Sequence, residues 1–210
     1  MPSIPYPAFA LIADGFTDDD RAERAVAAVR AGVRWVHLRD HGASSDAFGD
    51  AASALAARLW SVSEETVVTV NSHLPVADAM EVGLHVGRRG PSVGSARAVL
   101  GPDRLLGYSA HEDVEVAGDR TQEADYYFYS PVFPTSSKPD QPPAGVGALR
   151  SFCRVAAPTP VFALGGITPE RVSVCIEAGA EGVAVLSGVM EAEAPTAATR
   201  AYLRALAPVA

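Results

Sequence analysis

Polar and charged side chains come directly after a series of short apolar runs in this sequence. In chain order they are Arg39, Asp40 and His41; Asn71 and His73; Arg88 and Arg89; Ser109 and His111; Thr135, Ser136 and Lys138; Gly165 and Gly166; and Ser187 and Gly188. An imidazole can take and return a proton near neutral pH, and a guanidinium group binds carboxylates or phosphates through paired hydrogen bonds. These residue types suit acid–base chemistry on a small anion if the fold brings them together.

The elements that must position them follow a regular pattern. Apolar, β-branched runs predict strands at residues 9–13, 35–39, 67–71, 83–87, 105–109, 126–132, 161–165 and 182–187. Amphipathic segments between them predict helices at residues 18–31, 45–60, 75–81, 92–100, 114–123, 146–155, 169–177 and 196–207. Repeated βα units of this number predict an α/β fold, a (β/α)8 TIM barrel, as one domain over residues 1–210. A dinucleotide-binding sheet is disfavoured, because no G-x-G-x-x-G follows the first strand.

Glycines follow the last two predicted strands. In a parallel barrel the carboxyl ends of all strands meet at one mouth, and the loops after the seventh and eighth strands commonly hold phosphate. A phosphate approaches main-chain amides closely only where no Cβ stands in the way. We therefore expect phosphate to be bound by Gly165, Gly166, Leu186, Ser187 and Gly188. The alternative is that these glycines only make tight turns.

The composition limits the class of partner. The chain has 210 residues and a net charge of −8, and this charge disfavours nucleic acid or an anionic membrane as a partner. Cys153 and Cys175 fall in predicted helices, so we interpret them as buried free thiols rather than a disulfide or metal site. No apolar run approaches the roughly 20 residues of a membrane span, and the N-terminus has no basic leader. We expect a soluble, cytoplasmic protein that binds a small molecule.

Lys138 is the one lysine among 17 basic residues. It lies in a loop rich in proline, threonine and serine. Either the chain retains a compact point charge there for binding, or its position is an accident of composition.

Several motifs resemble one known family across nearly the whole chain. They are His37-Leu38-Arg39-Asp40, Gly83-Leu84-His85-Val86-Gly87, Gly107-Tyr108-Ser109-Ala110-His111, Ser130-Pro131-Val132-Phe133-Pro134-Thr135-Ser136-Ser137-Lys138, Leu164-Gly165-Gly166-Ile167 and Gly182-Val183-Ala184-Val185-Leu186-Ser187-Gly188, with Asn71 and Ala124-Asp125-Tyr126 between them. Together they look like the thiamine phosphate synthase and TenI family. The P-V-F-P-T-x-x-K and L-G-G-I-T segments are the most specific.

The resemblance implies two possible activities. Thiamine phosphate synthase joins a pyrimidine diphosphate to a thiazole phosphate and needs Mg²⁺, which the family binds with two aspartates. Those positions are Ser72 and Gly90 here, and the family's lysine in the second-strand motif is His41. A hydroxyl and a glycine do not replace two anionic ligands of a hard cation. Arg88 and Arg89 bring positive charge to the same rim and could hold an anion without a metal.

The TenI branch resembles this chain more closely. Its members lack the full metal site, carry a histidine after the fifth strand's G-x-S motif, and include a tautomerase that aromatises a carboxythiazole phosphate. His111 matches that histidine, which implies a general acid and base. Its alternative role is a residue of a helix N-terminus without chemistry. We expect no metal and no cofactor, and Mg²⁺ only if the chain is a synthase.

Other mouth residues complete the predicted site. Arg39 and His41 join His111 as predicted catalytic residues, with Arg39 on a substrate carboxylate or, alternatively, in an ion pair with Asp14 or Asp40. His73 is a weaker candidate for a second proton carrier. The predicted substrate-binding residues are Asn71, Ser109, Thr135, Ser136 and Lys138. His37 and His85 lie within strands, and core packing is the expected role of both.

Three hypotheses remain open. The first is a thiazole tautomerase of the TenI type, an isomerase that acts on a small phosphorylated thiazole. The second is a thiamine phosphate synthase with a rearranged diphosphate site. The third is a regulatory protein that binds thiazole or thiamine phosphate without catalysis. A homodimer is possible, since exposed barrel helices often pair, but no segment marks its interface.

Overall fold

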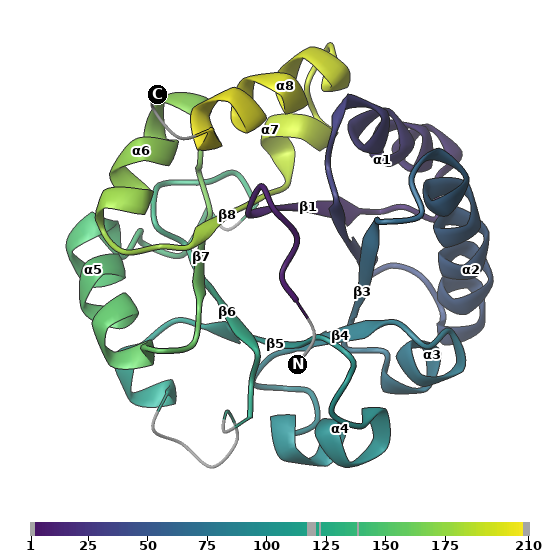
Figure 1. Cartoon of the computed structure of the whole chain (residues 1–210), viewed down its shortest axis with the longest axis horizontal. Helices are drawn as coiled ribbons and strands as arrows, with labels where there is room; N and C mark the ends of the chain where they lie inside the picture. The colour runs from purple at the N-terminus through teal and green to yellow at the C-terminus, as the bar shows by residue number, and fades with distance from the viewer. Residues whose placement is uncertain (1–2, 117–120, 122, 138, 208–210) are drawn as a thin grey trace.

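A closed barrel of parallel strands forms the centre of the molecule (Figure 1). The computed structural model describes residues 3–116, 121, 123–137 and 139–207. Within these residues, eight strands pair in chain order from β1 to β8, and β8 closes on β1. Helices alternate with the strands and surround them. The predicted (β/α)8 TIM barrel is confirmed.

The bounds of most elements agree with the sequence pattern. The strands are β1 Phe9–Asp14, β2 Trp35–Arg39, β3 Val67–Asn71, β4 Gly83–Val86, β5 Leu106–Ala110, β6 Tyr126–Tyr129, β7 Val161–Leu164 and β8 Gly182–Val185. The α-helices are α1 Asp19–Ala31, α2 Ser45–Val62, α3 Leu74–Ala79, α4 Val93–Leu100, α5 Gly145–Ala156, α6 Pro169–Glu177, α7 Ser187–Met190 and α8 Pro195–Leu206.

Three elements differ from the prediction. A 3-10 turn, η1 Asp113–Glu115, stands at the start of the helix predicted over residues 114–123, because the Glu112 and Glu115 side chains cap each other's backbone and close a tight turn. Residues 117–120 and 122 of that prediction lie outside the described residues. Strand β6 ends at Tyr129 rather than residue 132, since Pro131 has no N–H for a ladder. Leu186 leaves the extended conformation, so α7 begins where β8 was expected to continue.

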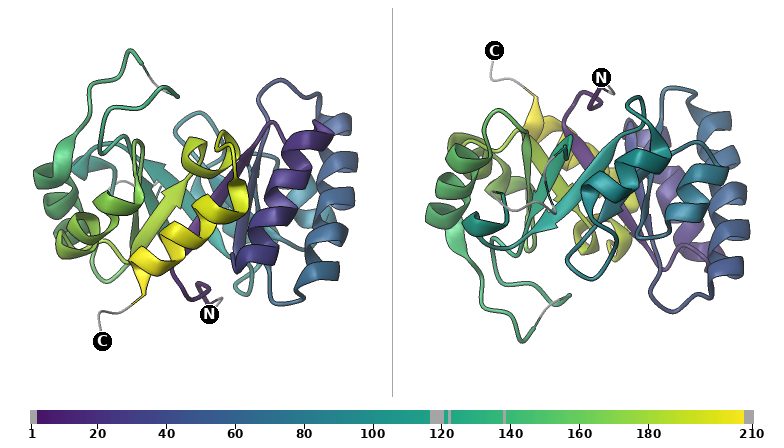
Figure 2. Two further views of the ribbon diagram at one scale, coloured as in Figure 1. Left: turned by 90° about the horizontal axis from the view of Figure 1, so that it is seen from above. Right: turned by 90° about the horizontal axis from the view of Figure 1, so that it is seen from below.

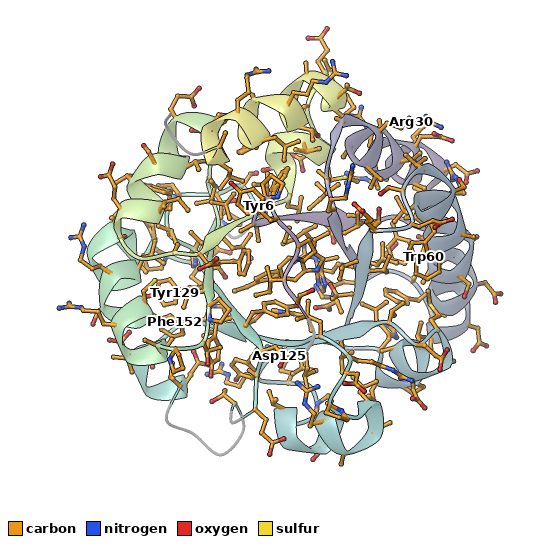
Figure 3. The ribbon with its side chains drawn as sticks, in the orientation of Figure 1. Tyr6, Arg30, Trp60, Asp125, Tyr129 and Phe152 are labelled. Carbon is orange, nitrogen blue, oxygen red and sulfur yellow. The ribbon has the colours of Figure 1, made fainter. Side chains whose placement is uncertain are left out.

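Aromatic rings fill the barrel interior. Trp35 packs edge-on against Tyr126 at 4.7 Å and against Phe162 at 5.1 Å between ring centroids. Glycine makes the room for them, because a Cβ on Gly107 would stand 2.0 Å from Tyr126 Cζ. Outside the sheet, Tyr129 stacks on Phe152 of α5 (Figure 3). The strands are thus buried on both faces, as a parallel barrel requires.

The two ends of the barrel are different. The segment before β1 lies across the opening seen in Figure 1, where Tyr6 is labelled in Figure 3. The loop between β6 and α5 projects from the opposite face (Figure 2). That face carries the carboxyl ends of the strands, where the predicted site residues lie. Within the described part of the chain, no helix combines the length and apolar character that crossing a bilayer needs.

Candidate active site

A pocket opens at the carboxyl ends of the strands, between the loops after β7 and β8. All five residues predicted to bind phosphate line it, and so do Arg39 and Thr135. The remaining lining residues are Ile12, Ser130, Pro131, Ser137, Leu164, Ile167, Ala184 and Val185. The two glycine-containing loops therefore lie at the same end of the barrel and face the same space.

The loop after β7 is held by its carbonyl groups. The carbonyls of Leu164 and Gly165 accept from the backbone of the β6–α5 loop, from Val132 N at 2.9 Å and Phe133 N at 3.0 Å. The next two carbonyls accept from side chains of the helical layer. Gly166 O accepts from Arg171 Nη1 at 2.6 Å, and Ile167 O accepts from the buried Tyr202 hydroxyl at 2.8 Å.

These contacts direct the amides of the same loop. In a trans peptide the C=O and the following N–H point to opposite sides. The amides of Ile167 and Thr168 therefore point away from the Arg171 and Tyr202 side chains. Arg171 also lies over the Phe133 ring, with Cζ 4.6 Å from the centroid, so its position is fixed on two sides. The loop can offer N–H groups to an anion without rearranging.

Close packing requires the two glycines after β7. Gly165 and Gly166 have φ of 95° and 63°, a region that costs other residues energy. A Cβ on Gly165 would lie 2.8 Å from Pro131 Cα, and one on Gly166 would lie 2.3 Å from Pro134 O. Gly165 and Gly166 therefore do make a tight turn, as the alternative explanation expected. Phosphate binding by the same loop remains a prediction.

Tyr202 connects the two loops of the pocket. Its hydroxyl donates to Ile167 O, and a Cβ on Gly188 would stand 2.1 Å from the Tyr202 hydroxyl oxygen. Helix α7 starts at Ser187, and the first amides of any helix have no intrahelical acceptor. The burial of Tyr202, which is 2% exposed, raises its pKa to about 12, so it remains a neutral donor.

His111 lies beside the pocket, not within its lining. Its Nδ1 is 2.6 Å from Ser130 O, and Ser130 lines the pocket wall. A carbonyl oxygen only accepts, so Nδ1 carries the hydrogen and Nε2 of the neutral ring is left as the base. The backbone N–H of His111 donates to Glu115 Oε2 at 2.5 Å. The contact with Ser130 O orients the ring, and the contact with Glu115 holds the backbone of the same residue.

Arg39 lines the pocket and already has a partner. Its Nε donates to Asp14 Oδ1 at 2.6 Å, which is the ion pair that the sequence left open. Asp40 instead accepts from Thr17 Oγ1 at 2.5 Å and Gly42 N at 2.8 Å. Burial would raise the pKa of Asp40, but these hydrogen bonds outweigh it and lower the pKa. Both carboxylates on this side are therefore engaged.

Apart from Arg39, the histidines and arginines that follow β2, β3 and β4 are not among the residues that line the pocket. His41 is exposed. His73 stacks on Phe48, with centroids 3.9 Å apart, and burial together with the nearby charge of His41 lowers its pKa. Arg88 and Arg89 are exposed on the loop after β4. The predicted catalytic His41 is thus not among the residues that line the pocket with Arg39 and the loops after β7 and β8.

The predicted substrate-binding residues fall into three groups. Thr135 lines the pocket, whereas Ser136 faces a neighbouring hollow formed by the rest of its loop. Asn71 is the last residue of β3 and Ser109 is the last but one of β5, and both are half-buried. Lys138 lies outside the described residues. His37 and His85 are each 2% exposed, as the core interpretation expects.

Sequence reasoning missed the residues that brace the site. Arg171 and Tyr202 are on α6 and α8 and act through main-chain carbonyls, which leave no motif. Ser130 and Ser137 line the pocket, but the sequence analysis named them only as part of a motif and assigned them no role. A basic residue five positions after a Gly-Gly pair is the one local signal that could have indicated Arg171.

The donor set at the rim does not fit Mg²⁺. The two family aspartate positions hold the exposed Ser72 and Gly90, whose N–H donates to Gly87 O at 2.9 Å. Among the residues that the structure describes, no three of His, Cys, Asp or Glu gather as a possible metal site. Mg²⁺ binding normally uses one or two carboxylates with waters and phosphates. We therefore assign no metal to this site.

Comparison with known proteins identifies the family. Residues 9–189 match the TMP-TENI family model, described as thiamine monophosphate synthase. This chain belongs to the TMP-TENI family. Thiamine-phosphate synthase from Salinibacter ruber is 36% identical over 192 residues, 90% of this chain and 83% of that protein. The enzyme of that name from Mycobacterium tuberculosis is 34% identical over 196 residues, 89% and 88% of the two chains.

A solved TMP-TENI structure has the same fold. Thiamine phosphate pyrophosphorylase from Pyrococcus furiosus superposes with a TM-score of 0.82 over 94% of both chains, at 23% identity. That identity is evidence for the fold alone. The relatives' names support the synthase half of the resemblance, and they give no support to the closer TenI placement that the motifs suggested.

Proposed function

We propose that this TMP-TENI protein is a thiamine-biosynthesis enzyme that binds a thiazole phosphate and isomerises it by proton transfer, without a metal. The observation that carries the proposal is the fixed tautomer of His111, whose Nδ1–H donates to Ser130 O and leaves Nε2 as a base beside the pocket. The missing carboxylates at positions 72 and 90 support the same choice against a metal-dependent step.

The phosphate end of the substrate is assigned to main-chain groups. Amides of Gly166, Ile167 and the first turn of α7 would bind the phosphate oxygens, and Thr135 would close the side of the pocket. Arg39, with Nε held by Asp14, offers its terminal N–H groups to a substrate carboxylate. Binding both anionic ends fixes the ring between them.

The proton then moves in two balanced steps. His111 Nε2 removes a proton from one carbon of the thiazole system and becomes imidazolium, which the Ser130 carbonyl stabilises through Nδ1–H. The same Nε2–H returns the proton to the second carbon and regenerates the neutral ring. No group is gained or lost, so the reaction is an isomerisation.

The second candidate is thiamine phosphate synthase. The names of relatives at 36% and 34% identity favour it. This reaction would require the diphosphate to be held at a rim with Arg88, Arg89 and His41 in place of the family's aspartates and lysine. Its substrates are a pyrimidine diphosphate and a thiazole phosphate.

One assay pair separates the candidates. We expect the protein to exchange deuterium from D₂O into a carboxythiazole phosphate, with no loss of rate in EDTA. His111→Gln should slow exchange by about a hundredfold to ten-thousandfold, the usual contribution of a general base. His41→Gln should cost less than about tenfold, since His41 is exposed and outside the pocket lining.

Three results would overturn the isomerase. Deuterium exchange at the full rate in His111→Gln would show that His111 is not the base. Formation of thiamine phosphate from the two synthase substrates with Mg²⁺, without exchange into the thiazole alone, would establish the second candidate. Binding with no turnover in either assay would leave a binding protein.

A further inference from the structure

One carboxylate is paired with the arginine that lines the pocket. Asp14 is the last residue of β1 and Arg39 the last residue of β2, and the two are register partners in the sheet. Arg39 Nε donates to Asp14 Oδ1 at 2.6 Å. Arg39 lines the pocket, whereas Asp14 does not. Asp14 can therefore act on a bound molecule through Arg39 and through its own charge.

The main chain around Asp14 is held in place. Arg21 Nη1, from the first turn of α1, donates to Asp14 O at 3.0 Å. Gly15 N donates to Arg39 O at 2.8 Å, which keeps the two strand ends together beyond their last ladder pair. The Asp14 carboxylate is thus presented to Arg39 without rearrangement.

The strand pattern places this carboxylate on the pocket side of β1. Ile12 lines the pocket, and residues two apart in a strand point to the same face of the sheet. Asp14 follows Ile12 toward the carboxyl end of the strand, and its ion pair with Arg39 agrees with this direction. The charge of Asp14 therefore lies close to whatever binds Arg39.

The pocket has two separate groups that can bind an anion. Nε of Arg39 is occupied by Asp14, and the two terminal nitrogens of the guanidinium retain four N–H donors. Strand β1 lies between β2 and β8, so Arg39 is about 10 Å across the sheet from the end of β8. A small molecule with an anion at each end therefore has two possible orientations in the pocket.

Charge distinguishes these orientations. Near pH 8 a phosphate group carries about two negative charges, whereas a carboxylate carries one. Repulsion from Asp14 grows in proportion to the charge, so a phosphate at Arg39 is repelled about twice as strongly as a carboxylate. Among the described residues that line the pocket, none is acidic, so the loops after β7 and β8 bring no such repulsion into the lining.

We propose that Asp14 determines the orientation of the substrate, because its charge keeps a phosphate dianion away from Arg39. Phosphate then binds the loops after β7 and β8, and a monoanionic carboxylate binds Arg39. Asp14 is a positioning residue, since it acts through Arg39. The side chains of Arg39 and Asp14 are 25% and 30% exposed, and an ion pair so exposed contributes little to stability. The proposal rests on the proposed function for the two anionic ends of the substrate and not for proton transfer at His111.

Titration of the full-length protein with inorganic phosphate or acetate at pH 8 and low salt tests this proposal. The Nε–H signal of Arg39 in ¹⁵N-labelled protein, assigned by its loss in Arg39→Lys, reports binding at that side chain. In Asp14→Asn the new Oδ1 can still accept from Nε–H, but its negative charge is gone. We expect phosphate affinity at Arg39 to rise at least about tenfold, and acetate affinity only about threefold, because acetate carries half the charge.

Two variants serve as controls. Asp14→Glu keeps the charge and should retain the wild-type preference for acetate at Arg39. Asp20→Asn removes the same charge from an exposed position on α1 and should leave both affinities at Arg39 unchanged. A gain in Asp20→Asn equal to that in Asp14→Asn would show a general effect of net charge and overturn the proposal.

The wild-type protein alone gives a decisive comparison. Acetate should move the Arg39 signal at lower concentration than phosphate does, and this result stands even if Asp14→Asn fails to fold. Tighter binding of phosphate than of acetate at Arg39 in the wild type, or equal gains for both in Asp14→Asn, would overturn the proposal. These titrations involve no turnover, so absence of deuterium exchange would overturn the isomerase without affecting them.

Discussion

The two sides of the barrel mouth differ in whether main-chain groups or side chains form them. On the β7 side, the main-chain carbonyls of residues 164–167 accept from Val132, Phe133, Arg171 and Tyr202. On the β3 to β5 side, polar side chains stand on a buried network of neutral imidazoles and hydroxyls. The first side depends on glycine and close packing, whereas the second depends on buried histidines whose pKa burial lowers. The same change of conditions should therefore affect the two sides differently.

Replacing a pocket glycine should have the largest effect. Gly166→Ala puts a Cβ 2.3 Å from Pro134 O at a φ of 63°. We expect unfolding by urea to show a loss of about 2 to 4 kcal/mol, combining overpacking with backbone strain. Phosphate affinity should fall with it.

Gly147→Ala is the matched control for that substitution. Gly147 lies in α5 with no neighbour within 4 Å of a new Cβ, so alanine should stabilise the protein by about 0.5 to 1 kcal/mol. Equal stability of the Gly166 variant and wild type would mean that the loop is not held as described.

Acid should lower the stability that the buried histidines on the β3 to β5 side contribute. The pKa of His37 is about 3 in the folded protein and 6.5 in the unfolded chain, so unfolding takes up a proton as the pH falls below 6.5. Stability is complete above pH 7 and is lost progressively down to about pH 3. Between pH 7 and 5 we expect a loss of about 2 kcal/mol from His37, with His85 acting in the same direction.

Urea unfolding at a series of pH values measures this loss. His37→Gln, which cannot titrate, should flatten the slope even if the variant is less stable overall. An unchanged slope in that variant would show that the buried imidazole is not responsible.

Removing one hydroxyl should have the smallest effect. Tyr202→Phe leaves the stacking on Phe9 and deletes the donor to Ile167 O. The expected cost is about 1 to 2 kcal/mol of stability, because the buried carbonyl loses its partner. Tyr6→Phe, at a side chain 70% exposed, should change nothing measurable.

A loss of phosphate affinity in Tyr202→Phe would show that this hydroxyl organises the loop as well as stabilising it. Unchanged stability in both tyrosine variants would contradict the contact itself.

The fold could be predicted because its signals are local. Strands β2 and β3 and helix α6 have the predicted bounds, since apolar runs and the Thr168-Pro169 start depend on neighbouring residues. The predicted helix over residues 114–123 was wrong at its start, where a reciprocal cap of two glutamates closes a 3-10 turn instead. Periodicity alone does not report such a contact between side chain and backbone.

The site was predictable in part for the same reason. Glycines and Arg39 could be placed at one pocket from strand order, and burial of His37 and His85 followed from their strands. The hydrogen bond from Tyr202 to Ile167 joins residues 35 apart in the sequence, and no motif carries it. His41 was grouped with the catalytic residues because it follows β2, but it is exposed and is not among the residues that line the pocket.

The central claim is that main-chain amides after β7 and β8 bind the phosphate. Titration of ¹⁵N-labelled protein with inorganic phosphate, followed by amide chemical shifts, tests it directly. The account predicts that the largest changes fall on Gly166, Ile167, Ser187 and Gly188, and that they are lost in Gly166→Ala. Largest changes at Arg88 and Arg89, with the loop amides unmoved, would contradict it.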